Sequence, residues 1–253
     1  MADVAPDAVT ADALLQGRVR LYQPARGARM SLDPVLLAGF LTPPFGRFLD
    51  IGCGAGPLSF LLLARDPDAS GVGVEIQARL AGLARRGRDD NGWAARLEIV
   101  EGDVRQVAVE LEAGAFDVVV TNPPYRTVEN SPPSPDRERA LAHHEITLRL
   151  GEWIDVAARA VRRSGRVAAI LPVARAGELF TALEARGLHP VRAREVVPRA
   201  SQAPSRILVE ASPSGASGRP PHERLQEPPL VVHEADGTFT PEVRRLLGEP
   251  VRS

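Results

Sequence analysis

The stretch RFLDIGCGAGPLSFLLLAR, residues 47–65, constrains the fold more than any other part of the sequence. An apolar strand pattern over 47–52 leads into a glycine-rich turn, and a helix pattern over 57–65 follows it. Pro57 stands in the first turn of that helix, where a missing N–H is tolerated. Glycines between a strand and a helix let the backbone bend tightly and approach a ligand closely. The stretch therefore predicts an α/β domain with a ligand-binding turn.

Strand and helix patterns alternate from Arg47 onward, and they predict an α/β fold. We expect a Rossmann-like doubly wound sheet of about seven strands that ends in a C-terminal antiparallel hairpin. The expected strands are 47–52, 71–76, 97–103, 117–122, 166–172, 189–197 and 206–212, with a short apolar piece at 230–237. The expected helices are 57–65, 77–89, 146–163, 174–187 and 241–248. Residues 1–15 are expected to be frayed, and the Pro-, Ser- and Gly-rich residues 212–229 to form an irregular loop.

Charge and cysteine content exclude several classes of protein. The formal net charge is −1, so no bulk electrostatic attraction favours nucleic acid or membrane. Cys53 is the only cysteine, which rules out a disulfide within the chain and a zinc site built from several cysteines. The amino terminus lacks a basic segment followed by an apolar core, and no apolar run is long enough to span a membrane. We therefore expect a soluble cytoplasmic protein.

Acidic residues stand at the ends of the first three strands: Asp50, Glu75 and Asp103. A carboxylate about 20 residues past the glycines can accept both hydroxyls of a ribose, and one after the third strand could accept the exocyclic amine of an adenine. A single acid at any of these positions is also typical of a helix cap or a solvated side chain, but three around one glycine turn indicate a nucleoside ligand. A dinucleotide turn would carry a further glycine where Pro57 stands, which counts against an NAD-dependent oxidoreductase.

The fourth strand ends in Asn122-Pro123-Pro124-Tyr125, which predicts chemistry at an amino group. The lone pair of an exocyclic or amide nitrogen is delocalised, and accepting hydrogen bonds from its two N–H groups concentrates it toward an electrophile. The Asn122 side-chain oxygen can accept one such bond and the Pro123 carbonyl the other, while the prolines fix φ and supply no competing N–H. Tyr125 offers a flat face on which a planar base can stack. As a bare tetrapeptide, the same residues would indicate only a rigid turn.

LDIGCGAG, GVGVEI, EGD and TNPPY, in this order and spacing over residues 45–212, resemble the class I S-adenosylmethionine-dependent methyltransferases of the amino-methylating branch. The resemblance implies that the motif acid and glycines face the methionine part of the cofactor, that Glu75 holds its ribose and that Asp103 holds its adenine. The implied cofactor-binding residues are Asp50, Gly52, Gly54, Gly56, Glu75, Asp103 and Asn122. The implied catalytic residues are Asn122, Pro123, Pro124 and Tyr125.

The segment GRVRLYQPARGARMSLDPVLLAGFL, residues 17–41, resembles the lead-in of the valine-tRNA adenine-N6 methyltransferases. The matching residues are Gln23, Gly27, Ser31, Asp33, Leu36, Leu37 and Ala38, and RALAHHEITL, PSRILVE and LVVHEADGTFTPEVRRLL extend the match. Ala28, Met30 and Arg126 depart from it, because that family often has aromatic residues there. The resemblance implies methylation of an adenine N6 in the anticodon loop of tRNA. Alternatives are a protein glutamine amide or guanine N2 of rRNA as acceptor, or a non-catalytic module that binds S-adenosylmethionine and RNA.

Other residues bear on partners and on domain organisation. The arginines expected to contact RNA are Arg126, Arg194, Arg199 and Arg206, although a merely solvated surface would have the same composition. The pair His143 and His144 is interpreted as solvated or capping, so no metal is expected.

We expect a monomer whose residues 1–44 close over the cofactor site and whose residues 45–212 form the methyltransferase domain. Residues 213–229 would be a loop, and 230–253 a strand and a helix packed on the same domain.

Overall fold

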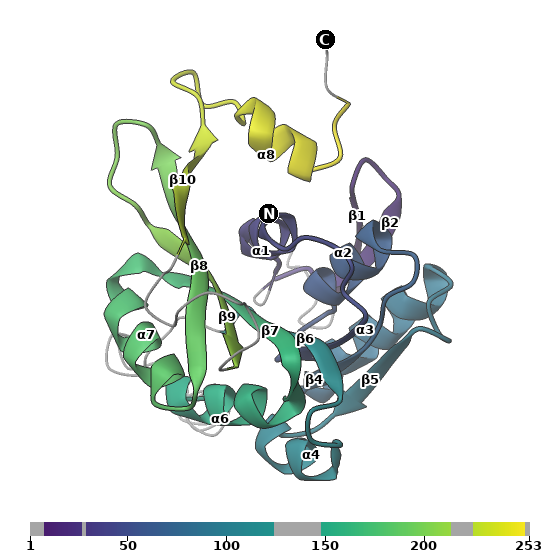
Figure 1. Ribbon diagram of the computed structural model, residues 1–253. Helices are drawn as coiled ribbons and strands as arrows, with labels where there is room; N and C mark the ends of the chain where they lie inside the picture. The colour runs from purple at the N-terminus through teal and green to yellow at the C-terminus, as the bar shows by residue number, and fades with distance from the viewer. Residues whose placement is uncertain (1–7, 27–28, 124–147, 214–224, 251–253) are drawn as a thin grey trace, which may run out of the picture.

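A computed structural model describes residues 8–26, 29–123, 148–213 and 225–250. Its eight-stranded sheet has the order β10-β8-β9-β7-β6-β3-β4-β5. The strands of this sheet are β3 (Arg47–Ile51), β4 (Ser70–Glu75), β5 (Leu97–Glu101), β6 (Phe116–Thr121), β7 (Val161–Pro172), β8 (Leu188–Arg199), β9 (Arg206–Pro213) and β10 (Leu225–His233). The helices are α1 (Asp33–Phe40), α2 (Pro57–Arg65), α3 (Ala78–Asp90), α4 (Val104–Glu110), α6 (Leu150–Ala160), α7 (Ala176–Glu184) and α8 (Pro241–Leu246), with a 3-10 turn η2 (Val173–Arg175). Figure 1 shows this arrangement.

The sheet has the predicted doubly wound form. Strands β5, β4, β3, β6 and β7 are parallel neighbours, and β9 runs antiparallel to both β7 and β8. The C-terminal hairpin is therefore β8–β9. Its second strand, β9, lies between β7 and β8 in the sheet. Strand β10 adds an eighth strand at the edge, parallel to β8. The carboxyl ends of β3, β4, β5 and β6 all meet at one edge of the sheet, which is where ligands bind in open α/β sheets.

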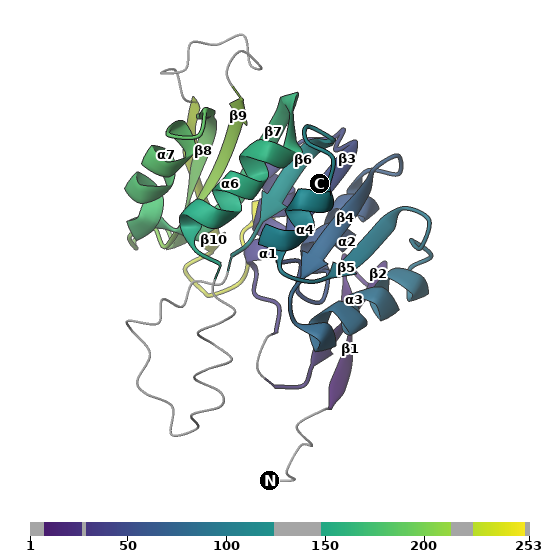
Figure 2. The same cartoon turned by 90° about the horizontal axis from the view of Figure 1, so that it is seen from below.

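Helices cover both faces of the sheet, as Figure 2 shows from below. Side chains alternate between the faces along each strand, so Val118 and Val120 of β6 join one buried cluster and Val119 joins the other. The first cluster contains residues of α1, α2 and α3, and the second contains residues of α4, α6 and α7. Burial on both faces explains the uninterrupted apolar run of β6.

A hairpin of β1 (Val9–Leu14) and β2 (Val19–Pro24) precedes the main sheet, so the expectation of a frayed segment over residues 1–15 is wrong for residues 9–14. Its turn places Leu15 and Gln16 at φ values of 50° and 58°, a conformation that favours glycine. The hairpin packs on α3: the Tyr22 hydroxyl donates a hydrogen bond to Asp90, and the Arg86 guanidinium lies 3.9 Å from the centre of the Tyr22 ring. These contacts anchor the amino-terminal segment on the C-terminal half of α3.

Strand β10 begins at Leu225, so the expected irregular loop over 213–229 is wrong for residues 225–229. Pro228 and Pro229 fall inside the strand, where the register with β8 shifts between Glu227 and Leu230. Proline cannot donate to a ladder, but an edge strand with a bulge tolerates it. Pro228 and Pro229 are therefore compatible with an edge strand and do not indicate a loop.

Two helices, α6 and α4, also differ from the sequence prediction. Helix α6 begins at Leu150 and ends at Ala160, within the predicted range 146–163, because the long strand β7 takes over at Val161. The short helix α4 (Val104–Glu110) is not predicted, although Val104, Val107 and Ala108 have helical spacing and pack on the second buried cluster. In the part of the chain that the structure describes, no helix has the length and apolar character needed to cross a membrane.

Candidate active site

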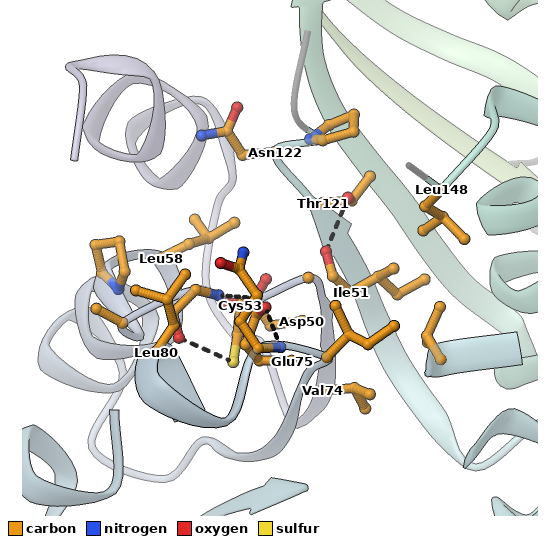
Figure 3. Close-up of a pocket in the computed structure, with 18 of the residues that line it drawn as sticks. Asp50, Ile51, Cys53, Leu58, Val74, Glu75, Leu80, Thr121, Asn122 and Leu148 are labelled. Atoms are coloured by element: carbon orange, nitrogen blue, oxygen red, sulfur yellow. Dashed lines mark hydrogen bonds between the residues drawn. The ribbon is translucent and has the colours of Figure 1, made fainter. Parts of the chain in front are cut away.

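A cavity of about 310 Å³ opens at the carboxyl ends of β3, β4, β5 and β6. It brings together most of the residues that the sequence marks, as Figure 3 shows. The predicted site residues that line it are Asp50, Gly52, Gly54, Glu75, Asp103, Asn122 and Pro123. Apolar side chains flank them on both sides, with Leu58 and Leu80 opposite Ile51 and Val74. Its size and its mixture of apolar walls and converging polar groups suit a small-molecule ligand.

The glycine turn forms the floor of this cavity. Gly52 and Gly54 have φ values of 71° and 58°, and a Cβ added at either position would meet no atom within 4 Å. A side chain there would therefore strain the backbone and fill space that a ligand could take. Gly56 is required for packing, because a Cβ at this position would lie 2.8 Å from the Phe60 ring. Gly56 is not among the described residues that line the cavity. Gly56 serves the close packing at the start of α2.

Asp50 is the last polar group of β3 and is almost fully buried. One carboxylate oxygen accepts hydrogen bonds from the Ser59 N–H at 3.1 Å and the Ser59 hydroxyl at 2.7 Å. Burial raises the pKa of Asp50 to about 7; the Ser59 bonds oppose this shift and the nearby charge of Glu75 adds to it. The carboxyl thus fixes the start of α2 while lining the cavity.

Glu75 ends β4 and is also buried. Its carboxylate accepts the Gly54 N–H at 2.9 Å with one oxygen and the Gln77 N–H at 2.8 Å with the other. Burial raises its pKa, although both backbone hydrogen bonds oppose the shift. Glu75 therefore links the end of β4 to the glycine turn, and the two carboxyl groups give the cavity an acidic floor.

Asp103 caps α4 by accepting the Arg105 N–H at 2.9 Å. The Arg105 guanidinium contacts both oxygens of that carboxylate and also donates to Glu152 of α6 at 3.0 Å. These hydrogen bonds hold the pKa of Asp103 below its usual value. Both Asp103 and Arg105 line the cavity, and Arg105 is a wall residue that the sequence prediction misses.

Asn122 and Pro123 lie directly beyond the end of β6. Thr121, the last residue of that strand, donates its hydroxyl to the Ile51 carbonyl at 3.0 Å and so ties β6 to β3. Asn122 stands at the opposite end of the cavity from the cluster of Asp50 and Glu75 (Figure 3). The remaining predicted residues of this region, Pro124, Tyr125, Arg126, His143 and His144, lie outside the described residues.

The amino-terminal segment supplies one wall, through Gln23, Arg29, Met30, Ser31 and Pro34. Gln23 is buried, accepts the Met30 N–H and donates to Asp12 at 3.0 Å. Arg29 also pairs with Asp12, at 3.2 Å. The sequence prediction names none of these as cofactor residues, although Gln23 and Ser31 belong to the matching lead-in.

The arginines expected to contact RNA have different environments. Arg194 donates two hydrogen bonds to Glu242 of α8, at 2.6 and 2.9 Å, and its side chain is only 16% exposed. Arg206 pairs with Asp33 at 3.2 Å. Arg199, at the end of β8, is exposed and makes no ion pair with any described residue. The described residues contain no group of three or more His, Cys, Asp or Glu side chains that could hold a metal ion.

Comparisons with known proteins agree with this geometry. The family model described as the methyltransferase small domain matches residues 32–164, just over half of the chain. The tRNA1(Val) (adenine(37)-N6)-methyltransferase of Porphyromonas gingivalis (strain ATCC 33277) is 33% identical over 237 residues, which cover 90% of this chain and 91% of the relative. The protein of that name from Shewanella sp. (strain MR-4) is 28% identical over 222 residues, 87% of this chain and 90% of the relative.

A solved structure also has this fold. An Agrobacterium tumefaciens protein, predicted to be an O-methyltransferase, aligns with a TM-score of 0.66 and 24% identity over 87% of this chain and 99% of that chain. This likeness shows the fold alone. The family match and the curated relatives confirm the predicted resemblance and with it S-adenosylmethionine as cofactor. This chain belongs to the class I S-adenosylmethionine-dependent methyltransferases with a methyltransferase small domain, in the family of the tRNA1(Val) adenine-N6 methyltransferases.

Proposed function

We propose that the enzyme transfers a methyl group from S-adenosylmethionine to the exocyclic N6 of an adenine in the anticodon loop of tRNA. The observation that carries this proposal is the position of Asn122 and Pro123 at one end of a cavity whose other end holds Glu75 and the glycine turn. This arrangement can hold a nucleoside cofactor and an amino acceptor side by side. The curated relatives, whose names specify tRNA, support the choice of acceptor.

The cavity residues fit the cofactor. Gly52 and Gly54 leave room where any side chain would intrude, so the methionine part of the cofactor would lie against the turn. Glu75 would accept the ribose hydroxyls and Asp103 the adenine amine, because ionised carboxylates are strong acceptors. The carboxyl groups of Asp50 and Glu75 also suit a ligand that carries a sulfonium and an ammonium charge, because a bound cation would favour their ionised forms and oppose the burial that raises their pKa values. The bound cofactor supplies an electrophilic methyl group.

Asn122 would act on the acceptor. Its side-chain oxygen accepts one N–H of the target amine and the Pro123 carbonyl accepts the other, which aims the nitrogen lone pair toward the methyl group. No separate general base is needed, because the methylated ammonium product loses its proton readily. The rate enhancement then comes mainly from positioning. The stacking role of Tyr125 stays a prediction.

The target base has to leave its stack before its amine can reach Asn122. Bases of an anticodon loop are already partly unstacked, which lowers this cost relative to a base in a helix. The amino-terminal segment would close over the bound cofactor, since Gln23, Arg29 and Ser31 already form a wall of the cavity. We place the enzyme in the cytoplasm with its tRNA substrate and propose that it acts as a monomer.

The test is a transfer assay with labelled S-adenosylmethionine and total tRNA, rRNA and protein from a strain that lacks the gene. We expect label in N6-methyladenosine of tRNA, identified by mass spectrometry of nucleoside digests. Label in a protein glutamine, or in guanine N2 of rRNA, with none in tRNA would show that the acceptor is wrong while the chemistry is right. Cofactor binding without transfer to any fraction would favour a non-catalytic module.

A further inference from the structure

Arg105 joins two parts of the site that are far apart in the sequence. It stands two residues after Asp103, in the first turn of α4, and its guanidinium contacts both oxygens of the Asp103 carboxylate. Its remaining terminal nitrogen donates to Glu152, 47 residues later in the first turn of α6. The other oxygen of Glu152 accepts the Arg149 N–H at 2.7 Å. The Arg105 side chain therefore connects Asp103, at the wall of the cavity, with the start of α6.

The contacts restrict how Asp103 can meet a ligand. A carboxylate on a short turn can rotate, whereas one held on both oxygens by a planar guanidinium and by a backbone N–H has one orientation. Each carboxylate oxygen has two acceptor sites, so these bonds still leave room for a further donor. The Asp103 side chain is 18% exposed and Arg105 43% exposed, so the ion pair itself adds little to stability. Its geometry therefore matters more than its strength.

We propose that Arg105 is a positioning residue that fixes the Asp103 carboxylate to accept the exocyclic amine of the cofactor's adenine, with Glu152 bracing Arg105 from α6. This inference rests on the proposed role of Asp103 as the adenine acceptor. It predicts that Arg105 sets the discrimination between purines that carry an amine at this position and purines that do not. A residue that merely stabilised the fold would affect both kinds of ligand equally.

Calorimetry with S-adenosylhomocysteine and S-inosylhomocysteine, in which an oxygen replaces the amine, separates the two roles. We expect the unaltered enzyme to bind the adenosyl ligand about tenfold more tightly, the effect of one hydrogen bond to a charged group. Arg105→Ala should reduce that ratio to about threefold or less by weakening the adenosyl ligand, and Glu152→Gln should reduce it less. A control is Arg85→Ala, which removes an arginine of comparable exposure that pairs with Glu101 outside the cavity lining and should keep the full ratio.

The possible results are distinct. An Arg105→Ala enzyme with the full ratio, or with tighter adenosyl binding because Asp103 has been released, would overturn the inference. An unaltered enzyme that binds both ligands equally would remove the adenine role of Asp103, on which the inference depends. An enzyme that binds neither ligand would contradict the proposed function itself. Circular dichroism melting of each variant identifies loss of fold as a separate cause.

Discussion

At the scale of single residues, Asp50 is the acid of the site whose charged form burial destabilises most clearly. Its carboxyl lies in the core between β3 and α2, where Ser59 donates two hydrogen bonds to it and Glu75 is the neighbouring acid. Burial disfavours the charged form, and the pKa rises from 3.8 to about 7. The folded protein therefore holds a proton between pH 4 and 7 that the unfolded chain has already released. Stability must fall as the pH rises through this window.

Asp50→Asn should remove this pH dependence while keeping an oxygen that accepts the Ser59 bonds. The stability of the unaltered protein relative to the variant should fall by on the order of 2–3 kcal/mol between pH 5 and pH 8, from the usual 1.36 kcal/mol per pKa unit. Urea unfolding of both proteins at the two pH values measures the difference. Parallel changes in the two proteins would mean that Asp50 titrates near its ordinary pKa.

Asn122 separates chemistry from cofactor binding. Asn122→Ala removes one acceptor of the target amine without touching the glycine turn, Glu75 or Asp103. Turnover should fall by on the order of 10²–10³, the scale of losing one well-placed polar group. The dissociation constant for S-adenosylmethionine should stay within about twofold, as measured by calorimetry beside single-turnover assays. Full turnover in this variant would exclude the proposed aiming of the lone pair.

At the scale of elements, Gln23 of β2 links the β1–β2 hairpin to the segment around Met30, and both residues line the cavity. Gln23→Ala leaves the Met30 N–H without its acceptor and removes the hydrogen bond to Asp12. We expect a loss of about 1 kcal/mol in stability, because the donor that loses its partner is only partly buried, and weaker binding of S-adenosylmethionine. Gln16→Ala, at the exposed tip of the same hairpin, is the control and should change neither quantity appreciably. Equal cofactor affinity in both variants would mean that the segment does not close over the cofactor.

Elements differ in how far local sequence determines them. Strand β3 and helix α2 are predictable because a long apolar run is divided by glycines that need positive φ. Strand β10 is not, since Pro228 and Pro229 indicate a loop unless the strand is known to lie at an edge. The acids of the site are predictable because strand ends meet at one edge of the sheet. The contacts of Arg105 and Gln23 depend on packing between distant elements, which no local pattern encodes.

At the scale of the whole molecule, the ends of β8 and β10 extend past the carboxyl edge of the sheet at which the cavity lies. Pro172 and Val196 both pair with Arg206, so Arg199 lies three residues beyond the end of β7. His233, at the end of β10, pairs with Arg199 and stacks on Phe239. Strands β8 and β10 lie at the margin of the sheet (Figure 1). With neighbouring strands about 4.8 Å apart, Arg199 stands roughly 14 Å to the side of β6, and it lies six residues beyond the level of Thr121, roughly 20 Å farther along the strand direction. It is therefore placed to meet RNA several nucleotides away from a base held at Asn122.

This geometry separates the two arginines of β8. Arg194 is committed to Glu242 and to the Pro228 carbonyl, so Arg194→Ala should lower stability by about 1 kcal/mol through lost contact between β8 and α8. Arg199 is exposed at the active-site edge, so Arg199→Ala should raise the KM for tRNA severalfold and leave stability unchanged. Neutralising one phosphate contact should also reduce the slope of log KM against log salt by about 0.7–0.9. Steady-state assays from low to physiological salt, with thermal melts of both variants, check this pair. An Arg199 variant with an unaltered salt slope would place the RNA on another face of the molecule.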